Sequence, residues 1–345
     1  MSPPIILIIL SCLATGTIIT MTSHHWLFAW IGLEMNTLAI IPTIATLHNP
    51  RSTEAATKYF LTQAAASAMI LFSSMTNAWQ MGTWDIISTM STPSHILLTL
   101  ALAMKLGLAP MHFWLPEVLQ GTTLFTALII STWQKLAPLA LIYLTITNLS
   151  TTILIILGLL SAIVGGWGGL NQTQTRKIMA YSSIAHLGWM FSIAPISTNI
   201  LILNLIIYLI ITMALFCFLI MTQSKTIQDT MMMWTLSPTM TSMVMILLLS
   251  LGGLPPLTGF MPKWLILEGL ITQNLTSVAM VMAMATLLSL FFYLRLTYTT
   301  ALTLSPNMLQ TKFKWRLNPN NFSLLMLTSS SLSILSLPMM PLIFF

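Results

Sequence analysis

A short passage occurs twice in this chain, and each copy lies inside a long apolar stretch. The copies run from Gly107 to Glu117 (GLAPMHFWLPE) and from Gly253 to Lys263 (GLPPLTGFMPK), and they share a Gly, a Leu and two Pro at matching places. Gly and Pro break a helix, and lipid cannot satisfy the freed backbone groups. Such a break therefore persists at membrane depth only where protein or a watery cavity covers it. Two broken helices at corresponding places in two halves are typical of the centre of a transporter built from repeats.

The composition excludes a water-soluble enzyme. Apolar residues make up 56% of the 345 residues and charged residues only 5%, whereas a soluble domain carries about 25% charged residues. The net charge of +6 indicates orientation in a membrane rather than nucleic-acid binding. Two cysteines, Cys12 and Cys217, are too few for a four-cysteine iron–sulfur site. No flavin, nicotinamide or metal motif is present, so we expect no cofactor or metal in this chain.

Hydropathy windows of roughly 19 residues predict an all-α polytopic membrane protein with about eleven transmembrane helices, two of them discontinuous. The predicted spans are 3–21, 25–47, 57–79, 95–115, 122–146, 151–169, 176–194, 198–220, 238–272 (with a break), 276–299 and 322–343. We expect one membrane domain, 1–345, with a first half at 25–150, an inverted second half at 151–300, and a polar loop and C-terminal helix at 301–345. The breaks are assigned to Gly107, Pro110, Gly253, Pro255 and Pro256.

The basic residues of the loops predict the orientation. All of them follow even-numbered spans: Arg51, Lys58, Arg176, Lys177, Lys225, Lys312, Lys314 and Arg316. Loops on the opposite side hold no Lys or Arg, which is a strong positive-inside signal. The N-terminus is therefore expected on the inner side and the C-terminus on the outer side. The two similar passages then run antiparallel, as in an inverted repeat.

Charged residues inside the predicted spans indicate proton transfer. Lys105 lies two residues before Gly107, Lys135 lies near the middle of a span three residues before Pro138, and Lys263 directly follows Pro262. One acid, Glu34, lies near the middle of another span. Each such charge costs at least about 2.5–3.5 kcal/mol at mid-membrane. One acid cannot neutralise three lysines, so a purely structural network is disfavoured. Burial stabilises neutral lysine and a nearby carboxylate stabilises its charged form, which suits a proton relay. Arg295 lies near the inner end of a span and can snorkel to the surface.

Two histidines are further candidates for this relay. His112 lies inside the first break and His186 near the middle of a span. Neutral imidazole both donates and accepts, so either could join the lysines through water. A hydrogen bond to a backbone carbonyl would explain either histidine equally well, and the sequence leaves this open.

Five motifs resemble the NADH dehydrogenase subunit 2 family of animal mitochondrial complex I, over about residues 25–300. They are RSTEAATKYF (51–60), KLGLAPMHFWLPE (105–117), WQKLAP (133–138), GGLNQTQ with RKIMAYSSIAH (168–186), and GGLPPLTGFMPKW (252–264). The resemblance implies an antiporter-like subunit of the proton-pumping membrane arm of NADH:ubiquinone oxidoreductase, without a redox site of its own. NADH, FMN, iron–sulfur clusters and ubiquinone would be bound by partner subunits.

The resemblance also implies roles for individual residues. Glu34 would be the acid beside the first lysine, Lys105 the proton-holding lysine, Lys135 the central connecting lysine and Lys263 the lysine of the second broken helix. His112 and His186 would fall on the hydrated path. The chain would lie in the mitochondrial inner membrane, with its N-terminus in the matrix and its C-terminus in the intermembrane space. Its partners would be other membrane-arm subunits, including neighbouring antiporter-like subunits, and lipids.

Two alternatives belong to other functional classes. A cation/proton antiporter that is not coupled to redox chemistry would depend on sodium rather than on NADH oxidation. A scaffold whose charges only bind neighbouring subunits would keep normal pumping stoichiometry after Lys135→Ala.

Overall fold

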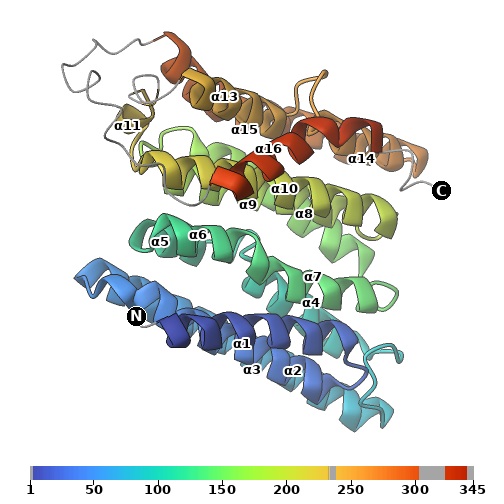
Figure 1. The fold of residues 1–345 in the computed structure, drawn as a ribbon. Helices are drawn as coiled ribbons and strands as arrows, with labels where there is room; N and C mark the ends of the chain where they lie inside the picture. Colours follow the sequence, from blue (N-terminus) through green and yellow to red (C-terminus); the bar gives the residue numbers. More distant parts are fainter. Residues whose placement is uncertain (1–2, 232, 234–237, 303–322, 340–345) are drawn as a thin grey trace. The chain divides into compact units, whose positions relative to one another are not determined.

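The computed structural model describes residues 3–231, 233, 238–302 and 323–339. Within these ranges every secondary-structure element longer than an isolated β-bridge is a helix (Figure 1). The helices up to residue 169 are α1 (Pro3–Thr22), α2 (Trp26–Ile44), η1 (Ala45–Leu47), α3 (Pro50–Met81), α4 (Thr92–Leu106), α5 (Trp114–Gly121), α6 (Leu124–Ser131), η2 (Trp133–Lys135), α7 (Leu136–Thr145) and α8 (Thr151–Gly169). Those that follow are α9 (Thr175–Ile193), α10 (Thr198–Thr222), α11 (Ile227–Met231), α13 (Pro238–Gly252), α14 (Phe260–Thr272), α15 (Thr276–Leu302), α16 (Ser323–Leu335) and η4 (Leu337–Met339).

Among the described residues, six helical segments are long and apolar enough to cross a membrane: Pro3–Thr22, Trp26–Ile44, Leu124–Thr145, Thr151–Gly169, Thr198–Thr222 and Thr276–Ala301. Three shorter apolar helices, Thr92–Leu106, Thr239–Gly252 and Met326–Leu335, add to them. The chain divides into two compact units, Met1–Ser161 and Ala162–Phe345. The expected polar segment 301–345 lies largely outside the described residues.

Small residues allow the first two helices to pack closely. A Cβ atom on Gly16 of α1 would lie 2.9 Å from the Gly32 carbonyl oxygen of α2, and one on Gly32 would lie 2.8 Å from the Gly16 oxygen. Larger side chains at either position would force the helices apart. Backbone contact of this kind is the usual way in which membrane helices associate.

Two of the predicted spans differ in detail from the structure. The predicted span 122–146 agrees with the helical segment Leu124–Thr145, but within it α6 ends at Ser131 and a 3-10 turn, Trp133–Lys135, precedes α7. Pro138 has no N–H to donate to the carbonyl four residues earlier, so it is tolerated only in the first turn of a new helix. Helix α3 begins at Pro50 rather than near 57, with Asn49 as its N-cap. Its first turns are polar, and a hydropathy window detects only the apolar part.

Hydrogen bonds within each unit join loops that the charge pattern assigns to the same side. In the first unit, the Ile86 N–H donates to the His24 oxygen (3.0 Å) and the Asn148 amide donates to the Ser88 oxygen (2.9 Å). In the second unit, the Thr175 N–H donates to the Lys225 oxygen at 3.1 Å. Each of these contacts joins loops that follow spans of the same parity.

Candidate functional site

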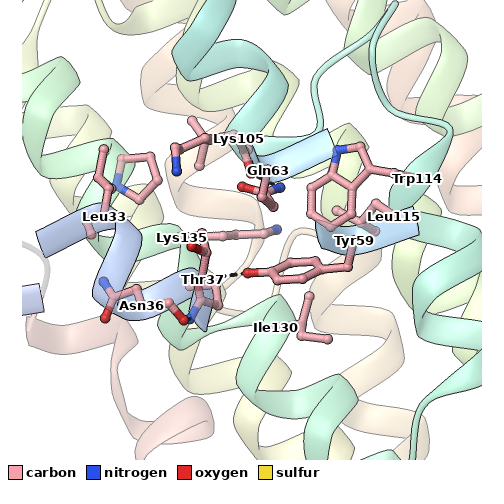
Figure 2. Close-up of a pocket in the computed structure, with 14 residues that line it drawn as sticks. Leu33, Asn36, Thr37, Tyr59, Gln63, Lys105, Trp114, Leu115, Ile130 and Lys135 are labelled. Atoms are coloured by element: carbon pink, nitrogen blue, oxygen red, sulfur yellow. Dashed lines mark hydrogen bonds between the residues drawn. The ribbon is translucent and has the colours of Figure 1, made fainter. Parts of the chain in front are cut away.

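A small buried cavity in the first unit brings together two of the three predicted lysines. Its volume is about 20 Å³, and Figure 2 shows the side chains around it. The lining residues come from α2, α3, α4, α5, α6, η2 and α7: Leu33, Asn36, Thr37, Tyr59, Gln63, Lys105, Leu106, Trp114, Leu115, Ile130, Gln134, Lys135, Ala137 and Pro138. The cavity therefore lies where the first broken passage meets the interrupted helix that carries Lys135.

Lys105 lies in the last turn of α4 and is 6% exposed. Its Nζ has no hydrogen-bond partner within the part of the chain that the structure describes. Lys135, in η2, is also buried and lines the same cavity. The 3-10 turn ahead of Pro138 therefore places the Lys135 side chain at the same cavity as Lys105.

Glu34 lies beside this cavity rather than in its wall. It follows Leu33 on α2, and the Thr37 hydroxyl donates to its Oε2 at 3.1 Å. The Glu34 carboxylate interacts electrostatically with Lys105 and with Tyr59. No direct ion pair joins Glu34 to Lys105 among the described residues. The acid therefore acts on the lysine across a short gap, and a change in that gap would alter the proton affinity of the lysine.

The helices that precede the two similar passages end with the same backbone geometry. Gly107 and Gly253 adopt left-handed φ angles of 78° and 81°. In each case the Gly N–H donates to the carbonyls three and four residues earlier, and the following Leu N–H donates to the carbonyl five residues earlier. This is the Schellman end of a helix, which requires a residue that tolerates positive φ. The next helix begins after seven residues in both cases, 107–113 and 253–259.

Lys263 is held differently from Lys105. It lies in the first turn of α14, and its Nζ donates to the carbonyl oxygens of Leu251 (3.2 Å) and Gly252 (2.9 Å) at the end of α13. A cation is favoured at a helix C-terminus, where the carbonyl groups are unpaired. A Cβ atom on Gly253 would lie 2.9 Å from this Nζ. Only glycine leaves room for the lysine to reach these carbonyls.

Neither histidine lines this cavity. His112 lies in the first break, is 6% exposed, and has its ring centroid 4.3 Å from that of Phe113, but it is not among the lining residues. His186 lies in α9 of the second unit, and its ring centroid is 5.4 Å from that of Tyr208. Among the described residues no three His, Cys, Asp or Glu side chains gather as metal ligands.

The cavity also contains polar residues that the sequence analysis did not select: Asn36, Tyr59, Gln63 and Gln134. The Tyr59 hydroxyl and the Gln134 amide oxygen are 3.5 Å apart, and Gln63 approaches the Lys105 carbonyl at 3.5 Å. A signal for two of them was present, because Tyr59 and Gln63 are four residues apart and therefore share one face of α3.

Comparison with known proteins identifies the family. The family model described as "NADH:quinone oxidoreductase/Mrp antiporter, TM" matches residues 23–289, and that of the NADH dehydrogenase subunit 2 C-terminus matches residues 290–344. Relatives from Varanus timorensis and Salmo salar, both named NADH-ubiquinone oxidoreductase chain 2, are each 55% identical over 342 residues. The alignments cover 99% of this chain and 99% and 97% of the relatives. This chain belongs to the NADH-ubiquinone oxidoreductase chain 2 family.

Solved structures resemble this chain 2 family member along most of its length. A chain of respiratory complex I from Thermus thermophilus with bound aureothin is 25% identical, with a TM-score of 0.83, and the match covers 97% of this chain and 79% of that one. A chain of the Mrp complex from Dietzia sp. is 17% identical, with a TM-score of 0.76, and covers 85% and 59% respectively. The second match concerns the fold alone. The chain 2 sequence therefore has an antiporter-like membrane fold.

Proposed function

We propose that this chain is a core membrane-arm subunit of respiratory complex I that moves protons through buried Glu and Lys residues while other subunits carry out the redox chemistry. Its family membership supports the assignment to respiratory complex I, and one structural observation supports the proposed proton path. Lys105 and Lys135 line one cavity, with the Glu34 carboxylate beside it. Two ammonium groups around one space repel each other, so a proton on one lysine disfavours a proton on the other. Protonation would then alternate between them.

The cavity has the properties of a water site. A water molecule needs about 10–15 Å³ and two to four polar partners. The cavity measures about 20 Å³, and Asn36, Gln134 and both lysines line it. The Asn36 side-chain amide and the Lys105 Nζ have no partner in the described part of the chain. One water molecule here would give both groups a partner and would carry a proton between the lysines.

The proposed path continues at Lys263, with His112 and His186 as further carriers, and these assignments rest on the family resemblance. The burial of each of these side chains supports them.

The matched ends of α4 and α13 support two discontinuous membrane helices, and with them the halves 25–150 and 151–300 within about eleven spans. The basic residues of the loops, together with the family resemblance, support an N-terminus in the matrix and a C-terminus in the intermembrane space of the mitochondrial inner membrane. Neighbouring membrane-arm subunits and lipids would cover the outer surface, and partner subunits would hold NADH, FMN, the iron–sulfur clusters and ubiquinone.

The first experiment measures the native mass of the particle that carries this chain after mild detergent extraction, with NADH–quinone activity assayed in the same band. We expect a very large particle that oxidises NADH. A small particle without that activity, whose transport depends on sodium, would instead favour an independent cation/proton antiporter.

The relay itself is tested by Lys135→Ala in the assembled complex. We expect fewer protons pumped per NADH oxidised, because the cavity loses one of its two proton carriers. Unchanged stoichiometry in an intact complex would favour a scaffold and defeat the relay.

A further inference from the structure

An ion pair at the rim of the first unit joins two helices on which the lysine cavity depends. The Lys58 Nζ on α3 lies 2.6 Å from the Glu117 Oε2 on α5 and also contacts Glu54 on its own helix. The side chains of Lys58 and Glu117 are 40% and 51% exposed. Lys58 therefore lies between one carboxylate that is fixed to its own helix and one that belongs to the helix after the break.

Helix α5 needs such support from its neighbours. It has eight residues, Trp114–Gly121, and an isolated helix shorter than about 12–15 residues is marginal in water. Its last residue packs directly on α3, because a Cβ atom on Gly121 would lie 2.6 Å from the Arg51 carbonyl oxygen. The Lys58–Glu117 pair lies one turn earlier on α5. Both contacts hold α5 against the first three turns of α3.

The same short helix forms a wall of the cavity. Its first two residues, Trp114 and Leu115, line the space around Lys105. The Trp114 Nε1 donates to the Met104 carbonyl oxygen at 3.1 Å, one residue before Lys105. Trp114 and Glu117 are three residues apart and share one face of the helix. A shift of α5 at Glu117 would therefore move the indole that holds the end of α4.

The repeat gives this position a counterpart. Glu117 ends the first passage as Lys263 ends the second, since both are the eleventh residue of the repeated sequence. Lys263 ties α14 to the carbonyls of α13, whereas Glu117 ties α5 to Lys58 of α3. In both units the residue at this position joins the helix after the break to a neighbouring helix. The contact is a pair of hydrogen bonds to carbonyls in one unit and an ion pair in the other, but it is made from the same position of the repeat.

We propose that Lys58 and Glu117 are positioning residues for proton transfer, because their ion pair holds α5 against α3 and thereby sets the surroundings of Lys105. This inference rests on the proposed relay function. An exposed ion pair contributes little to global stability, so variants that lack it should still fold and assemble. Lys58 keeps the Glu54 carboxylate as a partner when Glu117 is changed, and Glu54 therefore provides a matched control.

The experiment compares Lys58→Met, Glu117→Gln and the double variant with Glu54→Gln and Lys58→Arg in the intact, assembled complex. The readouts are the NADH-driven pumping rate and its pH profile. Misplacing a positioned group by 1 Å can cost up to about 100-fold in rate, so we expect a loss of roughly tenfold in Lys58→Met and Glu117→Gln. The double variant should be no worse than either single variant, because both remove the same contact. Glu54→Gln and Lys58→Arg should pump like the wild type.

Three outcomes would overturn the inference. They are wild-type pumping and pH profile in Glu117→Gln, an equal loss in Glu54→Gln, and additive losses in the double variant. If Glu117→Gln does not assemble, Glu117→Asp replaces it, and wild-type pumping in that variant together with Lys58→Met would overturn the inference as well. Lys105→Met separates the two hypotheses. Normal pumping by Lys105→Met defeats the relay, whereas its loss beside a normal Glu117→Gln defeats only the positioning role.

Discussion

The helices before the two broken passages end with the same backbone geometry, but the nearby lysines make different contacts. Both helices end on a left-handed glycine with the same hydrogen bonds, and both restart after seven residues. In the first unit, neutral donors approach the last carbonyls of the helix: Trp114 reaches Met104, and Gln63 reaches Lys105. In the second unit, the ammonium of Lys263 serves those carbonyls itself.

This difference separates the structural role of a buried charge from its role in transfer. The Lys105 Nζ has no partner among the described residues and faces a polar cavity. Its charge supports no contact there, so proton exchange would leave the fold unchanged. Charged Lys263 stabilises the end of α13, and loss of its proton weakens those hydrogen bonds. Under the proposed relay, the first passage would therefore suit proton exchange, whereas in the second passage protonation would be linked to the structure of the break.

Replacing each lysine by methionine should give the largest effects and the clearest contrast. We expect both Lys105→Met and Lys263→Met to lose proton pumping. Lys263→Met should also lose stability, on the order of 2 kcal/mol, because hydrogen bonds from a charged donor disappear and two buried carbonyls lose their partner. Lys105→Met should keep its stability, since it removes a buried charge that has no hydrogen bond in the described structure. Thermal inactivation and proton yield of the purified complex measure the two effects. Equal stability losses in both variants would break the comparison.

Alanine at the two glycines should have the next largest effects. Both glycines have positive φ, so each substitution costs roughly 1–2 kcal/mol in backbone strain. At Gly253 the new Cβ would also meet the Lys263 Nζ at 2.9 Å, whereas at Gly107 it would meet the Leu115 methyl at 3.0 Å. We therefore expect Gly253→Ala to lower pumping further than Gly107→Ala at a similar loss of thermal stability.

The control for this pair is Gly82→Ala, which has a similar φ of 72° and no atom within 4 Å of the added Cβ. It should show strain alone. If Gly82→Ala and Gly253→Ala reduced pumping equally, displacement of Lys263 would not be the cause.

Helix ends at Gly107 and Gly253 could be expected from the sequence because Gly and Pro act locally, and α4 and α13 end beside these residues. That the two ends interrupt membrane helices stays a prediction. Gly107 and Gly253 are each followed by a proline within three residues, and the repeated spacing marked them without any tertiary information. The interruption before Pro138 was missed, because a single proline is also tolerated in the first turn of a helix. A hydropathy window averages over the three residues of such a turn.

The lysines were predictable and their partners were not. A lysine inside an apolar stretch is conspicuous in any sequence. Lys105, Lys135 and Lys263 were therefore found from their positions in the sequence alone. That Lys105 and Lys135 share a cavity, and that Lys263 binds its own break, depends on which helices touch. Glu117 could have been found from the repeat, because it occupies the place of Lys263. Its partner Lys58 is far away in the sequence, and only packing of α5 on α3 brings them together.

The smallest expected effect comes from the Trp114 indole, the neutral donor that binds a carbonyl at the end of α4. Trp114→Phe keeps the ring that lines the cavity but removes the Nε1 donor to the Met104 carbonyl. A lost hydrogen bond of this kind costs about 1 kcal/mol, and the freed carbonyl becomes an acceptor one residue from Lys105. If the ammonium is free to move, it will bind that carbonyl as Lys263 binds Leu251 and Gly252. Pumping should then slow with little loss of stability, and its pH profile should shift upward because the charged lysine gains a partner. Trp264→Phe is the matched control, since that indole is 54% exposed. An unchanged pH profile in Trp114→Phe would mean that the difference between the passages is not set by the cap.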